Sequence, residues 1–166
     1  MSQKLNAFVP AAGIGERLRP ITEHIPKPLL PVLGRPLLAR TLDRVLALSV
    51  EHIGVNVHHK PQAVESWLNA SPYREGIQVF HEPRLLGTGG ALKNAESLLR
   101  EGPFLVHNAD ILTDIELQRL LEAHQAFGNF VTLALHDCPA FNKVAVDATG
   151  NVVGVGEVTI KPGGSR

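Results

Sequence analysis

Apolar residues recur along the chain in two patterns, short runs rich in β-forming residues and longer stretches with helical spacing. The short runs predict four strands, at residues 5–9, 52–57, 77–81 and 103–107. The helical spacing predicts four helices, at residues 36–48, 61–70, 89–100 and 114–126. Strands that alternate with helices are typical of βαβ units. The sequence therefore predicts an α/β fold built on a mostly parallel sheet.

Two of the predicted helices carry an apolar stripe. The stripes consist of Leu38, Leu42, Val45 and Leu46 in the first helix and of Leu117, Leu120 and Leu121 in the last. Residues at this spacing share one helix face, so we expect both stripes to be buried. Thr113 and Glu116 have the spacing of a capping box, which predicts that the last helix begins directly after Thr113.

The character of the chain changes after Phe127. Residues 130–135 read as a strand, and residues 143–147 and 152–157 predict a hairpin around Gly150. The end of the chain is therefore expected to be β-rich.

The composition fits one folded domain. The chain has 166 residues, of which 44% are hydrophobic, and this is enough for one substantial core. We expect a single domain over residues 1–166, in which residues 1–127 form the α/β core and residues 128–166 begin a further part.

Charge, cysteine content and apolar run length exclude several classes of protein. The 16 Lys and Arg residues balance 16 Asp and Glu residues, so we expect no nucleic-acid partner. Cys138 is the only cysteine, which excludes an internal disulfide, and no Cys/His cluster has zinc-finger spacing. The apolar stretches are interrupted well short of the roughly 20 residues of a membrane span, and no signal peptide pattern opens the chain. We expect a soluble cytoplasmic protein with no membrane partner.

A long loop follows the first predicted strand. Six of the twelve prolines lie between Pro10 and Pro36, which predicts a stiff and mostly irregular segment. Ligands of open α/β sheets bind at the carboxyl ends of the strands, where this loop begins. A long loop at that place is more often functional than not.

Residues 11–17, which we call the glycine loop, have the chemistry of a phosphate site. Gly13 and Gly15 allow backbone amides to approach an anion closely. Arg17 and, further along, Lys27 supply a forked and a point positive charge for phosphate oxygens. The segment therefore predicts a phosphate cradle.

The glycine loop departs from two common phosphate motifs. Leu18 stands where a dinucleotide-binding fingerprint has its third glycine. Unlike the lysine of a Walker A loop, Lys27 has no glycine before it and no Ser or Thr after it. The segment instead resembles the pattern G-x-G-x-R-[LM]-x-P-[LI]-T, followed by P-K-P-L, of the sugar-nucleotide pyrophosphorylases. Three further segments resemble that family in the same order. They are VNVHH at 55–59, EP at 82–83 with GTGGAL at 87–92, and HNAD at 107–110.

Within this family the chain looks most like the branch that contains mannose-1-phosphate guanylyltransferases and N-acetylmuramate-1-phosphate uridylyltransferases. The resemblance implies a Rossmann-like, three-layer α/β/α fold of the nucleotide-diphospho-sugar transferase type. It also implies transfer of a nucleoside monophosphate from a nucleoside triphosphate to a sugar 1-phosphate, which releases pyrophosphate. The nucleotide and the sugar phosphate are the implied partners, and Mg²⁺ is the implied cofactor.

The resemblance also implies a set of site residues. Arg17, Lys27 and Asp110 would be catalytic, with Arg17 on the triphosphate and Lys27 on phosphate oxygens at the reacting centre. Asp110 would be a ligand of Mg²⁺, a cation that prefers oxygen donors. The nucleotide would be bound by Ala11, Ala12, Gly13, Gly15, Asn56, Gly87, Thr88, Gly89 and Gly90. Gly87, Thr88, Gly89 and Gly90 would form a turn against the base and ribose.

Several acidic and histidine residues near these motifs have simpler interpretations. Asp110 follows a strand, so capping a turn is its alternative role. Asp114 lies at the predicted helix start, where a carboxylate stabilises the helix N-terminus. His58 and His59 would point to opposite faces of a strand, which favours surface or hydrogen-bonding roles over a metal site.

Four further residues are interpreted from their position alone. Asn56 either closes a strand-end turn or faces the nucleotide, and simple exposure is the plainer interpretation of Glu82. Arg19 and Arg35 lie outside the motif positions, so we exclude both from the site.

The chain also departs from the family. Ala109 stands where the family usually has a glycine, and its methyl group is expected to narrow the approach of a ligand slightly. No D-V-G-T type turn supplies a second metal-binding Asp, and Glu157 matches a late sugar-binding Glu only in isolation. We therefore expect the C-terminal part of the domain to be missing and the chain to be a portion of a longer protein. A short natural variant completed by a partner chain is the alternative.

Two other functions remain open from the sequence. One is a non-catalytic nucleotide-binding or regulatory module that keeps the glycine loop without a complete metal site. The other is a cytidylyltransferase that acts on an alcohol phosphate such as phosphocholine. The base, the acceptor and the oligomeric state, a homo-oligomer included, are not determined by the sequence.

Overall fold

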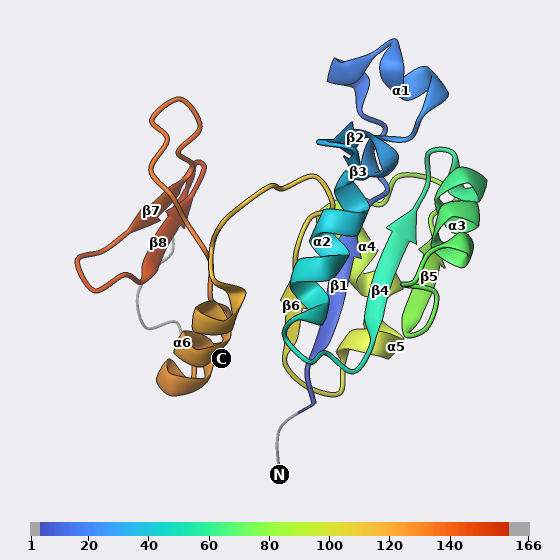
Figure 1. The fold of residues 1–166 in the computed structure, drawn as a ribbon. Coiled ribbons are helices and arrows are strands. Elements are labelled where there is room, and N and C mark those ends of the chain that lie inside the picture. Colours follow the sequence, from blue (N-terminus) through green and yellow to red (C-terminus); the bar gives the residue numbers. More distant parts are fainter. Residues whose placement is uncertain (1–3, 160–166) are drawn as a thin grey trace. The chain divides into compact units, whose positions relative to one another are not determined.

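A four-stranded parallel sheet forms the centre of the first of two units in the computed structural model (Figure 1). The structure describes residues 4–159, and the chain divides into the units Met1–Glu122 and Ala123–Arg166. The strands β1 (Asn6–Pro10), β4 (Ile53–Val57), β5 (Ile77–His81) and β6 (Phe104–Val106) lie in the order β5-β4-β1-β6. The predicted α/β fold with a parallel sheet is confirmed.

The register of the sheet brings three strand ends into one row. Pro10 of β1 pairs with Asn56 of β4, and Asn56 pairs with Phe80 of β5. The chain adds β4 and β5 on one side of β1 and then returns to add β6 on its other side. The strand order changes direction at β1, and ligands of open α/β sheets bind at such points.

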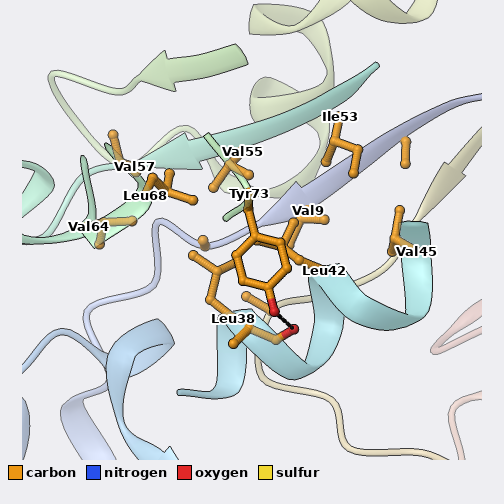
Figure 2. Packing of buried hydrophobic residues seen from close by; sticks show 14 residues of the cluster. Val9, Leu38, Leu42, Val45, Ile53, Val55, Val57, Val64, Leu68 and Tyr73 are labelled. Atoms are coloured by element: carbon orange, nitrogen blue, oxygen red, sulfur yellow. Dashed lines mark hydrogen bonds between the residues drawn. The ribbon is translucent and has the colours of Figure 1, made fainter. Parts of the chain in front are cut away.

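One face of the sheet is covered by α2 (Leu37–Leu46) and α3 (Pro61–Ala70). Apolar side chains of both helices pack against alternate residues of β1 and β4, as Figure 2 shows. The labelled members of this cluster are Val9, Leu38, Leu42, Val45, Ile53, Val55, Val57, Val64, Leu68 and Tyr73. Alternation along β4 places every second side chain on this face.

The opposite face is covered by α4 (Gly87–Asn94) and α5 (Glu96–Leu99), which completes the three layers. The rings of Phe8 and Phe80 meet there edge to face, with 6.2 Å between their centroids. Gly54 lies beside them, and a Cβ atom at this position would come within 2.9 Å of both rings and 2.7 Å of Leu98. The packing of this face therefore requires a glycine in β4.

The proline-rich segment after β1 contains short elements. They are η1 (Glu16–Leu18), α1 (Ile21–His24), η2 (Lys27–Leu29) and the antiparallel pair β2 (Pro31–Val32) and β3 (Arg35–Pro36). The Arg40 guanidinium, on α2, donates hydrogen bonds of 2.6 and 3.0 Å to the Val32 carbonyl. These bonds tie the hairpin to the helix that follows it.

Two details of the predicted helices differ in the structure. Leu46 is 45% exposed rather than buried, because α2 ends at this residue, and Leu37 joins the buried face instead. The helix predicted over residues 89–100 is two helices, α4 and α5, which meet at Ala95 with a ψ of 12°.

The last predicted helix, α6 (Leu117–Phe127), begins later than expected, and the predicted capping box is absent. The Thr113 hydroxyl accepts a bond of 3.1 Å from the Ile115 amide, a local turn that competes with a helix start. Glu116 instead forms an ion pair of 2.6 Å with Arg119. Of the predicted stripe, Leu117 is buried, while Leu120 and Leu121 are half-buried.

The second unit contains a three-stranded antiparallel sheet of β7 (Val144–Val146), β8 (Val152–Val155) and β9 (Val158–Thr159). The predicted hairpin around Gly150 is confirmed, and β9 was not predicted. Glu157 lies in the turn between β8 and β9. Hydrogen bonds from the Thr149 hydroxyl and the Asn151 amide hold the pKa of Asp147 below its ordinary value.

The strand predicted at residues 130–135 is wrong, since the structure assigns no strand to them. A short run of apolar residues favours an extended segment, but strand formation also depends on pairing with residues elsewhere in the chain. Within the same residues, α6 is the longest helix at 11 residues, and none of the helices has the length and apolar character that a bilayer crossing requires.

Tyr73 joins three parts of the first unit. Its hydroxyl donates a hydrogen bond of 2.5 Å to Asp43 of α2 and accepts one of 3.0 Å from Arg35 of β3. Its ring packs at 5.8 Å from that of Trp67 on α3. Burial, followed by the bond to Asp43, raises the pKa of Tyr73 above 10.0.

We expect Tyr73→Phe to lower the free energy of unfolding by about 1–2 kcal/mol near neutral pH, because the hydrogen bonds of the hydroxyl with Asp43 and Arg35 are lost. A raised pKa means that the folded state resists ionisation, so this contribution is present below the ordinary pKa of tyrosine and is lost as pH rises above it. The stability difference between wild type and variant should therefore shrink above about pH 10, as measured by urea unfolding. Since Tyr73 is the only tyrosine, titration of phenolate absorbance reports its pKa directly, and an ordinary value would contradict the prediction.

Candidate functional site

A cleft of about 1000 Å³ lies at the carboxyl ends of the parallel strands. It is lined by the segment after β1, the ends of β4 and β5, the start of α4 and the segment after β6. The lining residues are Pro10, Ala11, Ala12, Gly13, Ile14, Gly15, Glu16, Arg17, Leu18, Lys27, Pro28, Asn56, Glu82, Leu85, Gly87, Thr88, Ala91, Asn108, Ala109 and Asp110. The structure thus brings together most of the residues that the sequence predicted for the site.

The glycine loop is fixed at its far end by a tight turn. Gly15 has a φ of 72°, and its carbonyl accepts a hydrogen bond of 3.0 Å from the buried Thr22 hydroxyl. The Thr22 carbonyl in turn lies 2.9 Å from Nε2 of His59. The expected hydrogen-bonding role of His59 is confirmed, whereas the role of Thr22 was missed although it closes the motif.

The glycine loop lines the cleft along its whole length. Within the described part of the chain, the amides of residues 12–15 form no hydrogen bond with protein groups. Gly13 is exposed, and no atom lies within 4 Å of the position that a Cβ would occupy there. A series of free amides in a turn is a typical anion-binding concavity.

The charged residues that line this cleft include Arg17, Lys27 and Asp110, which come from different segments. Lys27 of η2 forms an ion pair and hydrogen bond with Asp110, 83 residues away. Their side chains are 25% and 38% exposed, so ligands can reach both groups. Arg17 of η1 is exposed and makes no side-chain hydrogen bond or ion pair with the rest of the described chain. The site therefore holds one unengaged cation and one ion pair.

Asn56 and Glu82 form a buried polar pair below the glycine loop. Asn56 accepts a hydrogen bond of 2.6 Å from the Ala11 amide and donates one of 2.6 Å to Glu82. The second Glu82 oxygen accepts a bond of 3.0 Å from the Leu86 amide. Asn56 and Glu82 are 2% and 4% exposed, so the exposed position considered for Glu82 is wrong. The sequence alone did not reveal the burial of Glu82, because its partner Asn56 lies 26 residues away along the chain.

Residues 87–90 form the first turn of α4 rather than an isolated turn. Gly87 has a φ of 68° and, with Thr88, lines the cleft. Gly89 and Gly90 do not line it, and a Cβ on Gly90 would lie 2.7 Å from Leu86. The first amides of a helix point out of its N-terminus and favour an anion or a polar edge.

Other residues considered from the sequence do not line the cleft. His58 lies 2.7 Å through Nδ1 from the Glu82 carbonyl, which confirms a hydrogen-bonding role. Arg19 does not line the cleft, and Arg35 pairs with Asp43 at 2.8 Å. Asp114 lies in the segment before α6 rather than in its first turn, so the role assigned to it at a helix start is wrong.

Ala109 lines the cleft but is only 2% exposed, and it belongs to the same buried cluster as Leu42. Most of the residue is therefore accommodated by the core, and little of it is left to narrow the cleft.

Asp110 is the residue of the cleft that the sequence predicted as a ligand of a divalent cation. Within the described residues, no group of three or more His, Cys, Asp or Glu side chains is arranged to hold a metal ion. Asp110 has one oxygen bonded to Lys27 and a second oxygen available. Mg²⁺ typically takes one or two carboxylates and completes its shell with phosphate and water oxygens. Asp110 fits a cation that arrives with a phosphate ligand.

Comparisons with known proteins identify relatives of the chain. The family model described as "Nucleotidyl transferase" matches residues 7–157. Mannose-1-phosphate guanylyltransferase from Mycobacterium tuberculosis is 35% identical over 165 residues, which cover 97% of this chain and 46% of that protein. N-acetylmuramate alpha-1-phosphate uridylyltransferase from Caulobacter vibrioides is 44% identical over 109 residues, which cover 63% of this chain and 45% of that protein. The chain spans less than half the length of these curated relatives.

A solved structure has the same fold. HddC from Yersinia pseudotuberculosis, complexed with GMP-PN, superposes with a TM-score of 0.73 over 93% of this chain and 69% of that chain, at 22% identity. The resemblance to sugar-nucleotide pyrophosphorylases noted in the sequence is confirmed by the family match and the curated relatives.

We expect Gly15→Ala to destabilise the first unit by about 1–3 kcal/mol. Its Cβ would stand 2.8 Å from the Thr22 methyl carbon and 3.2 Å from Cβ of Lys27, at a φ of 72°. Gly13→Ala is the matched control, because open space surrounds that position. Thermal unfolding of the three proteins tests this, and equal losses in both variants would contradict it.

Proposed function

Because the chain belongs to the nucleotidyl transferase family, we propose that it forms the nucleotide-binding part of an enzyme that makes nucleotide sugars. The reaction transfers a nucleoside monophosphate from a nucleoside triphosphate to a sugar 1-phosphate and releases pyrophosphate. One observation carries the proposal: free loop amides, Arg17, Lys27 and Asp110 line a single cleft at the strand ends.

The glycine loop is the proposed triphosphate site. Amides of residues 12–15 donate to phosphate oxygens, while the Ala11 amide is already engaged by Asn56. Arg17 adds a planar guanidinium that can bind two oxygens at once. The open surroundings of Gly13 leave room for a phosphate group.

Lys27 and Asp110 are the proposed groups at the reacting centre. Lys27 neutralises charge that develops on phosphate oxygens. Asp110 would hold Mg²⁺ through its second carboxylate oxygen, and the bound cation supplies charge neutralisation and alignment of the triphosphate.

The proposed chemistry requires no nucleophile from the protein. An oxygen of the sugar phosphate attacks the α-phosphorus in line, and the bond to pyrophosphate breaks. The protein's part is to align the two substrates and to stabilise the negative charge. Lys27 and Arg17 do this by charge, and the loop amides do it by fixed dipoles.

We place the reaction in the cytoplasm, where nucleoside triphosphates are available. The one cysteine, Cys138, is a free thiol. Free thiols are typical of reducing compartments.

A non-catalytic nucleotide-binding module is the second candidate. The observation that favours it is the small number of carboxylates available to a metal ion: of the acidic residues that line the cleft, Glu82 is committed to Asn56 and Leu86, which leaves Asp110 and the exposed Glu16. Such a module would bind nucleotide in the same cleft without turnover.

Calorimetric titration of the chain with GTP, UTP, CTP and dTTP, each with and without Mg²⁺, tests the proposal. Saturable, Mg²⁺-sensitive binding of one triphosphate is expected and identifies the base. Pyrophosphate release is then assayed with sugar 1-phosphates and with phosphocholine as acceptors. Binding without turnover favours the module, and absence of all binding contradicts a nucleotide site in this chain.

We expect Arg17→Ala to weaken triphosphate binding about 10- to 100-fold with or without Mg²⁺, because a charged hydrogen-bond donor is lost. Asp110→Ala should instead remove mainly the Mg²⁺-dependent part of the affinity. Arg19→Ala is the matched control, because Arg19 is also exposed but does not line the cleft. The assigned roles are contradicted if titration gives the first two variants the same Mg²⁺ dependence.

A further inference from the structure

Four groups form a continuous chain of hydrogen bonds between the two amide-bearing walls of the cleft. The Ala11 amide donates to Asn56 Oδ1, Asn56 Nδ2 donates to Glu82 Oε1, and the Leu86 amide donates to Glu82 Oε2. The three distances are 2.6, 2.6 and 3.0 Å. This hydrogen-bond chain joins the end of β1 to the residue before α4 through the ends of β4 and β5.

The donors at its two ends determine the direction of each bond in this hydrogen-bond chain. The amides of Ala11 and Leu86 can only donate, so residues 56 and 82 must present acceptors to them. Between these two residues one donor is then needed. A carboxamide at residue 56 and a carboxylate at residue 82, both of whose oxygens accept, give three donors for three acceptors.

The two ends of the hydrogen-bond chain lie next to the free loop amides and to the start of α4. Ala11 directly precedes the free amides of residues 12–15, and Leu86 directly precedes Gly87, where α4 begins. Asn56 and Glu82 are almost fully buried, so a mismatched group could not exchange its partner for water.

We propose that Asn56 and Glu82 are positioning residues that hold the glycine loop and the N-terminus of α4 at a constant separation. The proposal rests on the proposed function, because that separation matters for a nucleotide bound between the two segments. Asn56 was predicted among the nucleotide-binding residues, and here it acts through the Ala11 amide. Glu82 acts through the Leu86 amide.

Two isosteric substitutions each disrupt the match of donors and acceptors at one residue. Glu82→Gln replaces an acceptor by a donor, so one N–H group of the chain loses its acceptor in either amide orientation. Asn56→Asp removes the donor and places two carboxylate oxygens face to face.

The double variant Asn56→Asp with Glu82→Gln restores three donors and three acceptors. The new carboxylate at position 56 accepts from the Ala11 amide and from the new carboxamide at position 82. The oxygen of that carboxamide then accepts from the Leu86 amide. The hydrogen-bond chain is therefore complete again, with its central bond running in the opposite direction.

Amide hydrogen exchange, followed by NMR on the unliganded chain, tests the pair without any nucleotide. We expect each single variant to raise the exchange rate of the Ala11 or Leu86 amide at least about tenfold, and the double variant to return both rates to within about threefold of wild type. The matched control is Asn69→Asp with Glu75→Gln, which makes the same changes at exposed residues outside the cleft and should leave both rates unchanged.

Titration with the triphosphate that binds wild type gives the second readout. Each single variant should raise the Kd about tenfold or more, and the double variant should recover it to within about threefold. Unchanged exchange in the single variants, a double variant no better than the worse single variant, or recovered exchange without recovered affinity would each overturn the proposal. If wild type binds no triphosphate, the proposed function fails, and the exchange rates still decide whether the pair holds the two segments.

Discussion

The parallel pairing of β1 with β4 and of β4 with β5 determines where functional groups can meet in this protein. Because Pro10, Asn56 and Phe80 occupy one row, the residues that follow β1 and β5 leave the sheet at the same edge, with Asn56 between them. Pairing of β1 with β6 brings the segment of Asp110 to the other side of the same strand. A shift of register by one residue would turn Asn56 to the other face of the sheet.

Most of the fold could be predicted from the sequence, because burial of one or both faces of a helix or strand gives its apolar residues a regular spacing. Residues 77–81 and 61–70 match β5 and α3, where runs of apolar residues have clear ends. The failures occurred where a local pattern depends on distant partners. Residues 130–135 form an apolar run but are not a strand in the structure, and Thr113 takes a local turn in place of a capping box.

The cleft was predicted unevenly, for a physical reason. Gly15, Arg17 and Lys27 carry conformational or charge properties that predict a phosphate site from residue type alone. Glu82 does not, because a carboxylate next to a strand end is ordinary until Asn56 and the Leu86 amide are known to enclose it. Asp110 stands between these cases: its strand-end position was clear, but its pairing with Lys27 required the fold.

The Lys27–Asp110 ion pair makes the cleft a place where opposite charges must exchange partners together. A phosphate group that drew Lys27 away would leave the Asp110 carboxylate without its cation, and a metal ion on the second Asp110 oxygen would weaken the attraction between that carboxylate and Lys27. Each ligand therefore lowers the free-energy cost of admitting the other. By thermodynamic linkage the assistance is reciprocal, so the proposed anion and divalent cation would bind here as a cooperative pair.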